Sequence, residues 1–177
     1  MLGRAGNDLA FADVKLDHGD VLSLGSQRFE ARRTPGHTEG CVTYVWSEEG
    51  EPAPLAAFTG DALLYRACGR TDFQGGSAHA LYDSVWGHIL SLPENTPLLA
   101  AHDYKGFTSS TVEEEKKFNP RLTKTQSEFV HVMDALGLAP PKKLDLAVPA
   151  NRRDGMPDKA PGQPSNVEAS AALNTIP

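Results

Sequence analysis

Two segments of this sequence share a layout that restricts the possible folds more than any other feature. In Thr34–Trp46 and in Phe58–Leu63, an apolar run with a preference for β-strand adjoins a tight turn that contains glycine. Each turn carries one side chain that can bind a metal ion, His37 in the first and Asp61 in the second. Loops at strand ends in a layered fold commonly bring distant residues together at a site. Together with a third turn, which follows Leu98–Ala101 and carries His102, we interpret these turns as one rim of a metal site.

A third stretch, Leu98–Tyr104, repeats this arrangement without the glycine. His102 follows the apolar run there, and Asp103 comes directly after it. His102 could ligate a metal, with Asp103 as the acceptor that a metal-bound imidazole usually has for its other ring N–H. Equally, His102 could pack at a strand end while Asp103 caps the turn toward Lys105. The residues alone leave both interpretations open.

The two turns suit more than one kind of metal chemistry. A neutral imidazole and a carboxylate from separate strand ends make up two-thirds of the 2-His-1-carboxylate set, which suits non-haem Fe(II) with open positions. The same donors suit a zinc hydrolase. Taken singly, His37 could be a surface histidine and Asp61 a turn residue after Gly60. Spacing does not choose between these alternatives.

Composition argues against several other classes of protein. A formal net charge of −6 and the lack of any basic run argue against broad electrostatic binding to nucleic acid. No apolar run reaches the length needed to cross a bilayer, and the first residues lack the apolar core of a secretory signal. Cys41 and Cys68 form neither a CxxC pair nor a disulfide framework, which favours a reducing compartment, the cytoplasm. A length of 177 residues suits one domain with a sizeable core.

Hydrophobic patterning predicts the strands. Two short apolar alternations in Val14–Leu24, on either side of His18-Gly19-Asp20, predict a β-hairpin. Runs that are rich in β-branched, aromatic or other apolar residues predict further strands at Arg28–Arg32, Cys41–Trp46, Leu55–Thr59 and Thr96–Ala101.

Three helices are expected from apolar spacing and capping motifs. The first has a buried face at three- and four-residue steps, which consists of Leu81, Val85, Ile89 and Leu92. The second begins at a capping box, Ser110–Glu113, and runs to about Phe118. The third begins at another box, Thr125–Glu128, and ends at Gly137. Strands followed by helices predict an α+β layered domain, and the composition of residues 154–177 predicts a flexible tail.

Three further side chains could bind an anion. An arginine fork binds carboxylates in a bidentate manner and a tyrosine adds an O–H donor, so Arg70, Tyr104 and Arg121 could form such a set. Taken singly, each of them reads as a surface residue. Cys68 has no base beside it in the sequence, so we expect a small buried or loop cysteine and not a reactive thiol.

Eight short motifs occur in a fixed order between residues 13 and 153. They are Thr34–Tyr44, Phe58–Leu63, Cys68–Phe73, Leu81–Val85, Ala101–Gly106, Thr111–Glu115, Asn119–Thr123 and Leu146–Asn151. In sequence and order they resemble the persulfide dioxygenases, which are the sulfur dioxygenases of the ethylmalonic encephalopathy protein type. These form a branch of the metallo-β-lactamase superfamily close to glyoxalase II. The turns at His37 and Asp61 belong to the wider superfamily, whereas Cys68–Phe73 and Asn119–Thr123 are more particular to the dioxygenase branch.

This resemblance implies a metallo-β-lactamase-like αββα sandwich that holds one Fe(II) per site. The ligands in that family are two histidines and one aspartate, and the resemblance assigns the second histidine to His37 and the aspartate to Asp61. The implied reaction is the oxidation of glutathione persulfide by O₂ to sulfite and glutathione. The implied compartment is the mitochondrial matrix if the source is eukaryotic, and a homodimer is compatible with the family.

The resemblance also gives roles to the remaining candidates. Arg70, Tyr104 and Arg121 match family positions around the glutathione site or its support. His102 matches a ligand of the second metal in glyoxalase II, a metal that the dioxygenases do not use. A hydrolase-like site of that kind would hold zinc.

One part of the family pattern has no counterpart in this sequence. The first histidine ligand of the family comes from a His-x-His-x-Asp-His motif, and no such motif occurs here. We therefore expect residues 1–153 to form the C-terminal two-thirds of the family's domain, with at most two of the three iron ligands. Three functions follow from the residues and the resemblance: a persulfide dioxygenase, a glyoxalase II-like binuclear thioester hydrolase, or a non-catalytic fragment.

Overall fold

The computed structural model describes residues 2–3, 14–72 and 75–151. The chain divides into two compact units, and among the described residues the boundary falls between Ala139 and Pro140. The domain predicted for residues 1–153 extends outside the described ranges and the tail predicted for residues 154–177 lies entirely outside them, so their boundary stays a prediction. Within these ranges, no helix has the length and apolar character that a membrane span requires.

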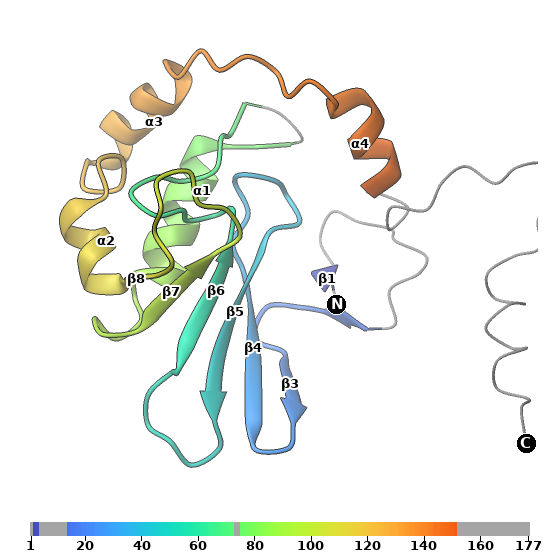
Figure 1. Ribbon diagram of the computed structural model, residues 1–177, viewed down its shortest axis with the longest axis vertical. Helices are drawn as coiled ribbons and strands as arrows, with labels where there is room; N and C mark the ends of the chain where they lie inside the picture. The colour runs from blue at the N-terminus through green and yellow to red at the C-terminus, as the bar shows by residue number, and fades with distance from the viewer. Residues whose placement is uncertain (1, 4–13, 73–74, 152–177) are drawn as a thin grey trace, which may run out of the picture. The chain divides into compact units, whose positions relative to one another are not determined.

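The first unit is built on a six-stranded sheet with strands in sequence order (Figure 1). Its members are β3 (Val21–Leu24), β4 (Gln27–Arg33), β5 (Val42–Glu48), β6 (Ala56–Gly60), β7 (Pro97–Ala100) and β8 (Ser110–Thr111). Neighbouring strands are antiparallel except β6 and β7, which are parallel. A separate two-stranded parallel sheet joins β1 (Leu2–Gly3) to β2 (Lys15–Leu16).

The hairpin predicted at Val14–Leu24 is wrong, although the four other predicted strands are confirmed as β4 to β7. Instead, β3 pairs with β4 across a tight turn in which Gly25 has a φ of 60°. A positive φ at that position is what a two-residue hairpin turn requires. The turn at Gly19 forms backbone hydrogen bonds with β4 and does not close a hairpin: the Gly19 N–H donates to the Ala31 carbonyl at 2.7 Å. The two apolar alternations therefore belong to different sheets.

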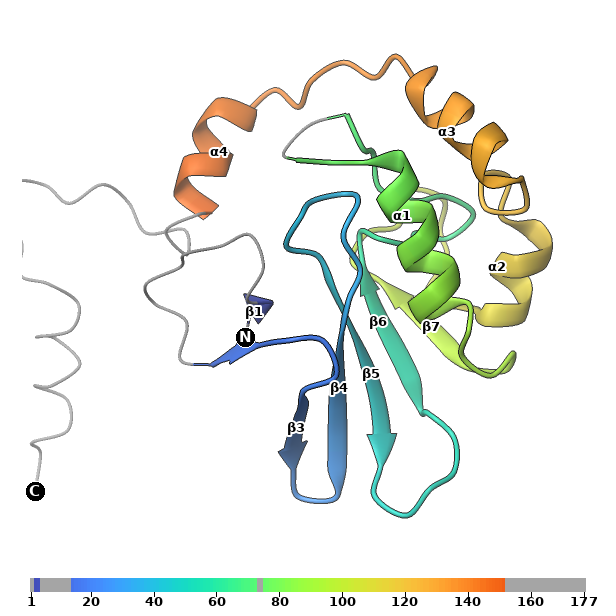
Figure 2. The ribbon, with the colours of Figure 1, turned by 180° about the vertical axis from the view of Figure 1, so that it is seen from behind.

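The described residues form four α-helices. They are α1 (Ala78–Ser84), which continues directly into a π-helical turn at Val85–Ile89, α2 (Val112–Phe118), α3 (Gln126–Asp134) and, in the second unit, α4 (Leu144–Asn151). The predicted buried face of the first helix is confirmed, because Leu81, Val85 and Ile89 have no exposed surface. Figure 2 shows α1 lying across one face of the sheet.

The core lies between that face and the helices. Val45, Ala57 and Leu98, one residue from each of three neighbouring strands, lie on this face of the sheet. They pack with apolar residues of all three helices of the first unit. From α3, Phe129 is fully buried and its ring lies 5.3 Å from that of Tyr82, centroid to centroid. Burying a side chain of this size contributes roughly 2–3 kcal/mol.

The opposite face of the sheet is aromatic. Trp46 stacks between Phe29, at a centroid distance of 6.1 Å, and Phe58, at 6.3 Å. Phe58 keeps 38% of its surface exposed. This is the face on which a sandwich fold places its second sheet.

The two capping boxes had different outcomes. The box at Thr125–Glu128 is confirmed, with the Thr125 N–H donating to Glu128 Oε2 at 2.9 Å and the Glu128 N–H donating to Thr125 Oγ1 at 3.4 Å. The predicted cap at Ser110 is wrong by one residue, since Thr111 caps α2. Ser110 pairs with Leu98 in the sheet and is therefore still strand.

Strand direction determines where the site can lie. Since β5 is antiparallel to both β4 and β6, and β6 is parallel to β7, three strands run the same way. Their C-terminal ends meet at one edge of the sheet. The loops that carry His37, Asp61 and His102 all leave from that edge.

Candidate metal centre

The loop after β4 carries His37 in a turn that packs closely against α1. Gly36 has a φ of 136°, and a Cβ there would lie 2.3 Å from the backbone nitrogen of Leu81. Only glycine permits this close approach of turn and helix. The Ser84 hydroxyl donates to the Pro35 carbonyl at 2.7 Å, and the Ser77 N–H donates to the Gly36 carbonyl at 2.8 Å. The backbone that carries His37 is thereby fixed to α1.

A single hydrogen bond defines the tautomer of His37. Its Nδ1 lies 2.7 Å from the Arg70 carbonyl oxygen. A carbonyl can only accept, so Nδ1 carries a hydrogen, and in the neutral imidazole Nε2 then has the lone pair. Nε2 lies 3.7 Å from Oδ2 of Asp61. Metal-binding histidines commonly donate their second ring N–H in this manner, and the lone pair then points at the ion.

Gly69 brings the loop after β6 into contact with both candidate ligands. Its N–H donates to the Asp61 carbonyl at 2.8 Å. A Cβ at this position would lie 2.4 Å from that same carbonyl oxygen and 2.7 Å from Cγ of His37. Sequence reasoning included Gly69 in the Cys68–Phe73 motif but gave it no role of its own.

Asp61 lies between two imidazoles. His102 Nδ1 is 2.7 Å from Asp61 Oδ1, on the other side of the carboxylate from His37. The His102 side chain is 54% exposed and stacks on Tyr104 at a centroid distance of 6.1 Å. All three strand-end residues predicted to converge therefore do so. Asp103 is different, because its Oδ2 accepts the backbone N–H groups of residues 105, 106 and 107, as a turn aspartate does.

The described residues supply two donors of the predicted iron set. A metal ion about 2.1 Å from each ligand can bridge atoms up to about 4.2 Å apart, so His37 Nε2 and Asp61 Oδ2 are close enough to share one ion. Within residues 2–3, 14–72 and 75–151, however, no group of three or more His, Cys, Asp or Glu side chains is arranged to hold a metal. The donors fit part of a metal centre and do not complete it.

The predicted anion set is engaged in other contacts. The Arg70 guanidinium binds both carboxylate oxygens of Asp72 at 2.6 Å and donates to the Leu138 and Ala139 carbonyls at 3.0 and 2.9 Å. Arg121 Nη1 donates to the Cys68 carbonyl at 3.0 Å. Tyr104 is 80% exposed. In this structure both arginines support the loop, and their contact with an anion stays a prediction.

Cys68 is buried, as expected for a cysteine without a neighbouring base. Only 3% of its surface is exposed, and its Sγ lies 3.6 Å from Sδ of Met133. Burial raises the pKa of this thiol, which opposes formation of a reactive thiolate.

Comparison with known proteins identifies the class. A family model of the metallo-β-lactamase superfamily matches residues 4–102, more than half of the chain. The chain therefore belongs to the metallo-β-lactamase superfamily, and the predicted α+β fold class is confirmed.

Within this superfamily, the chain is similar to persulfide dioxygenases. It is 52% identical to the mitochondrial persulfide dioxygenase ETHE1 of Mus musculus over 147 residues, which are 83% of this chain and 56% of that protein. The crystal structure of ETHE1 from Myxococcus xanthus matches with a TM-score of 0.77 and 44% identity, over 84% of this chain and 63% of that one. A probable metallo-hydrolase of Burkholderia pseudomallei is 38% identical over 77% of this chain and 49% of that protein. The chain spans about half the length of the curated relatives it matches.

Proposed function

We propose that this chain carries part of the active site of an Fe(II) persulfide dioxygenase, with His37 and Asp61 as two of the iron ligands. The observation that carries the proposal is the bond from His37 Nδ1 to the Arg70 carbonyl, which leaves Nε2 as the donor beside Asp61. The similarity to persulfide dioxygenases supports the choice of reaction. That reaction converts glutathione persulfide, O₂ and water into glutathione, sulfite and two protons.

The residues would divide the work as follows. Bound Fe(II) would supply open positions for O₂ and for the terminal sulfur of the persulfide. His37 donates Nδ1–H to the Arg70 carbonyl, and in the neutral imidazole Nε2 would be the atom that binds the ion. His102 Nδ1 donates to Asp61 Oδ1, which fixes the orientation of the carboxylate. Asp61 can then present Oδ2 on the side that faces His37.

The proposed site needs one more ligand than the described residues supply. The family's other histidine belongs to a motif that this sequence does not contain. We therefore propose that the 177-residue chain binds iron weakly and turns over slowly. A third role, as a non-catalytic fragment, corresponds to complete loss of turnover.

A hydrolase-like site is the second candidate. Asp61 contacts His37 on one side and His102 on the other, and a carboxylate in that position can bridge two metal ions. The similarity to a probable metallo-hydrolase agrees with this alternative. The expected reaction would be thioester hydrolysis in a binuclear zinc site, with no consumption of O₂.

Metal analysis and two assays separate these candidates. The chain would be loaded with Fe(II) or Zn(II) and tested for O₂ uptake with glutathione persulfide and for hydrolysis of S-lactoylglutathione. We expect weak, iron-dependent O₂ uptake that His37→Ala and Asp61→Ala each abolish, while His102→Ala reduces it only in part. Thioester hydrolysis with two metals per chain would favour the hydrolase instead. Tight stoichiometric iron with full O₂ uptake would contradict the incomplete site.

A further inference from the structure

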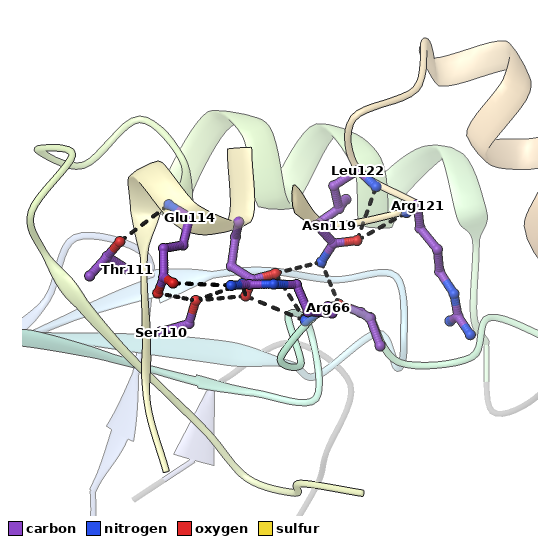
Figure 3. A network of polar contacts seen from close by, with 9 residues as sticks. Arg66, Ser110, Thr111, Glu114, Asn119, Arg121 and Leu122 are labelled. Atoms are coloured by element: carbon purple, nitrogen blue, oxygen red, sulfur yellow. Dashed lines mark hydrogen bonds and ion pairs between the residues drawn. The ribbon is translucent and has the colours of Figure 1, made fainter. Parts of the chain in front are cut away.

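A buried carboxylate lies on α2, away from the candidate ligands. Glu115 has no exposed surface, and a buried carboxylate is costly unless it is paired and hydrogen-bonded. It accepts the Ser110 hydroxyl at 2.7 Å and the Asn119 side-chain amide at 2.8 Å. It also accepts the backbone N–H of Arg66 at 3.1 Å and forms an ion pair with the Arg66 guanidinium. Figure 3 shows this network.

Arg66 has an unusual backbone conformation. Its φ of 54° makes it the only described residue other than glycine with a positive φ. Such a conformation costs of order 1 kcal/mol and persists only where the surrounding contacts over-determine it. The contacts that do so here are those of Glu115 to both the backbone and the side chain, with Glu114 adding a bond to Arg66 Nη2 at 3.1 Å.

The next two residues are anchored to the turn that follows α2. The Asn119 side-chain amide donates to the Ala67 carbonyl, and Arg121 Nη1 donates to the Cys68 carbonyl, each at 3.0 Å. Asn119 is itself fully buried, and its Oδ1 accepts the Arg121 N–H at 3.1 Å. Three successive residues, 66 to 68, are therefore held by α2 and the turn that follows it.

The following two residues contact the candidate ligands. Gly69 leaves no room for a Cβ against the His37 ring, and the Arg70 carbonyl accepts the His37 Nδ1–H. A displacement of residues 66–68 would move that carbonyl, because only one residue separates them. The network around Glu115 thus lies at one end of a five-residue run whose other end fixes the tautomer of His37.

We propose that Glu115, acting through Arg66, is a positioning residue for His37. Glu115 touches neither His37 nor Asp61, and its effect passes through the backbone of residues 66–70. The inference rests on the proposed function only in calling His37 a metal ligand. The placement of His37 can be tested on the metal-free chain.

Long-range ¹H–¹⁵N NMR reports the tautomer of each imidazole and serves as the readout. In the wild-type chain we expect the Nδ1–H tautomer at His37. In Glu115→Gln we expect loss of this single form and a mixture of the two tautomers, because the Arg70 carbonyl is no longer held in place. Glu113→Gln is the matched control, since Glu113 lies on the same helix and pairs with Lys117. It should leave the His37 signals unchanged.

A second variant covers the case in which Glu115→Gln fails to fold. Arg66→Gly combined with Glu115→Gln removes both charges of the ion pair, so that no buried charge is left unpaired, and relieves the strain, because glycine adopts a φ near 54° without cost. We expect this variant to fold and to show the mixed tautomers, while Arg66→Lys, which keeps the charge, returns part of the wild-type signal.

Thermal unfolding of the same variants distinguishes positioning from general support. A lower Tm with an unchanged His37 tautomer in every variant that folds would overturn the proposal. The metal-binding proposal fails separately. Suppose that wild-type His37 shows the Nδ1–H tautomer and the variants lose it, but His37→Ala leaves metal binding unchanged. Then the positioning role of Glu115 is supported, and the assignment of His37 as a metal ligand is wrong.

Discussion

The two loops that follow the parallel strands β6 and β7 leave the same edge of the sheet but are held in different ways. Residues 66–68, in the loop after β6, are anchored to side chains from α2 and beyond, up to 53 positions away in the sequence. In the loop after β7, residues 101–109 are all exposed, and Asp103 bonds the backbone of its own loop. The site therefore has a rigid side, which presents Asp61 and orients His37, and an exposed side, which presents His102.

The largest effect is expected on the rigid side, from Gly69→Ala. The added Cβ would lie 2.4 Å from the Asp61 carbonyl oxygen and 2.7 Å from His37 Cγ, so the backbone must shift. We expect a loss of about 1–3 kcal/mol in the free energy of unfolding and a loss of the Nδ1–H tautomer of His37. Metal affinity should fall roughly 10- to 100-fold, as it does when a ligand loses its orienting partner.

Gly106→Ala tests the same change in the other loop. Unlike Gly69, Gly106 has a positive φ, of 90°, at which alanine is strained, but nothing lies within 4 Å of the position its Cβ would take. Denaturant unfolding and NMR of both variants would make the comparison. Equal perturbation of His37 by the two substitutions would show that the loops do not differ in rigidity.

A smaller effect is expected from Asp72→Asn, in the loop after β6. Asp72 holds the Arg70 guanidinium, which in turn reaches the Leu138 carbonyl. Hydrogen bonds from Arg70 lower the pKa of Asp72. Its contribution to folding is therefore full above the ordinary value of about 3.9 and is lost as the pH falls through the lowered value.

The Nε–H resonance of Arg70 gives the measurement. In the wild type it should keep its hydrogen-bonded position down to a pH below 3.9 and then shift. In Asp72→Asn it should be shifted at every pH, while the tautomer of His37 stays as in the wild type. A resonance that does not respond to pH would contradict the role given to Asp72.

The difference between the loops also separates what the sequence could predict from what it could not. His37, Asp61 and His102 each follow a strand-like run, so their convergence could be predicted from local pattern and strand direction. The tautomer of His37 could not, because it depends on a carbonyl 33 residues away. Gly69 is part of the Cys68–Phe73 motif, but its close approach to His37 depends on tertiary packing that the motif does not report.

The burial of Glu115 could not be predicted from the sequence either, because the residues beside it indicate an exposed position. Glu115 follows Glu113 and Glu114 and precedes two lysines, which is the pattern of a solvated helix face. Its burial depends on packing against Arg66, 49 positions away. The same limit explains the wrong hairpin at Val14–Leu24, where the apolar alternation was right for strands but contained no information on which strand each would pair with.

The smallest effect is expected on the exposed side, from Asp103→Asn. The substitution keeps one oxygen acceptor but removes the charge that strengthens the three backbone bonds to residues 105–107. The loop is exposed, so water replaces the weakened bonds, and the cost should stay below about 1 kcal/mol. Amide hydrogen exchange should quicken at Lys105–Phe107 alone. The His37 tautomer should not change, because the contacts of Asp103 stay within its own loop. If His37 did change, the two sides of the site would be coupled, and Asp61, which contacts both His37 and His102, offers one route.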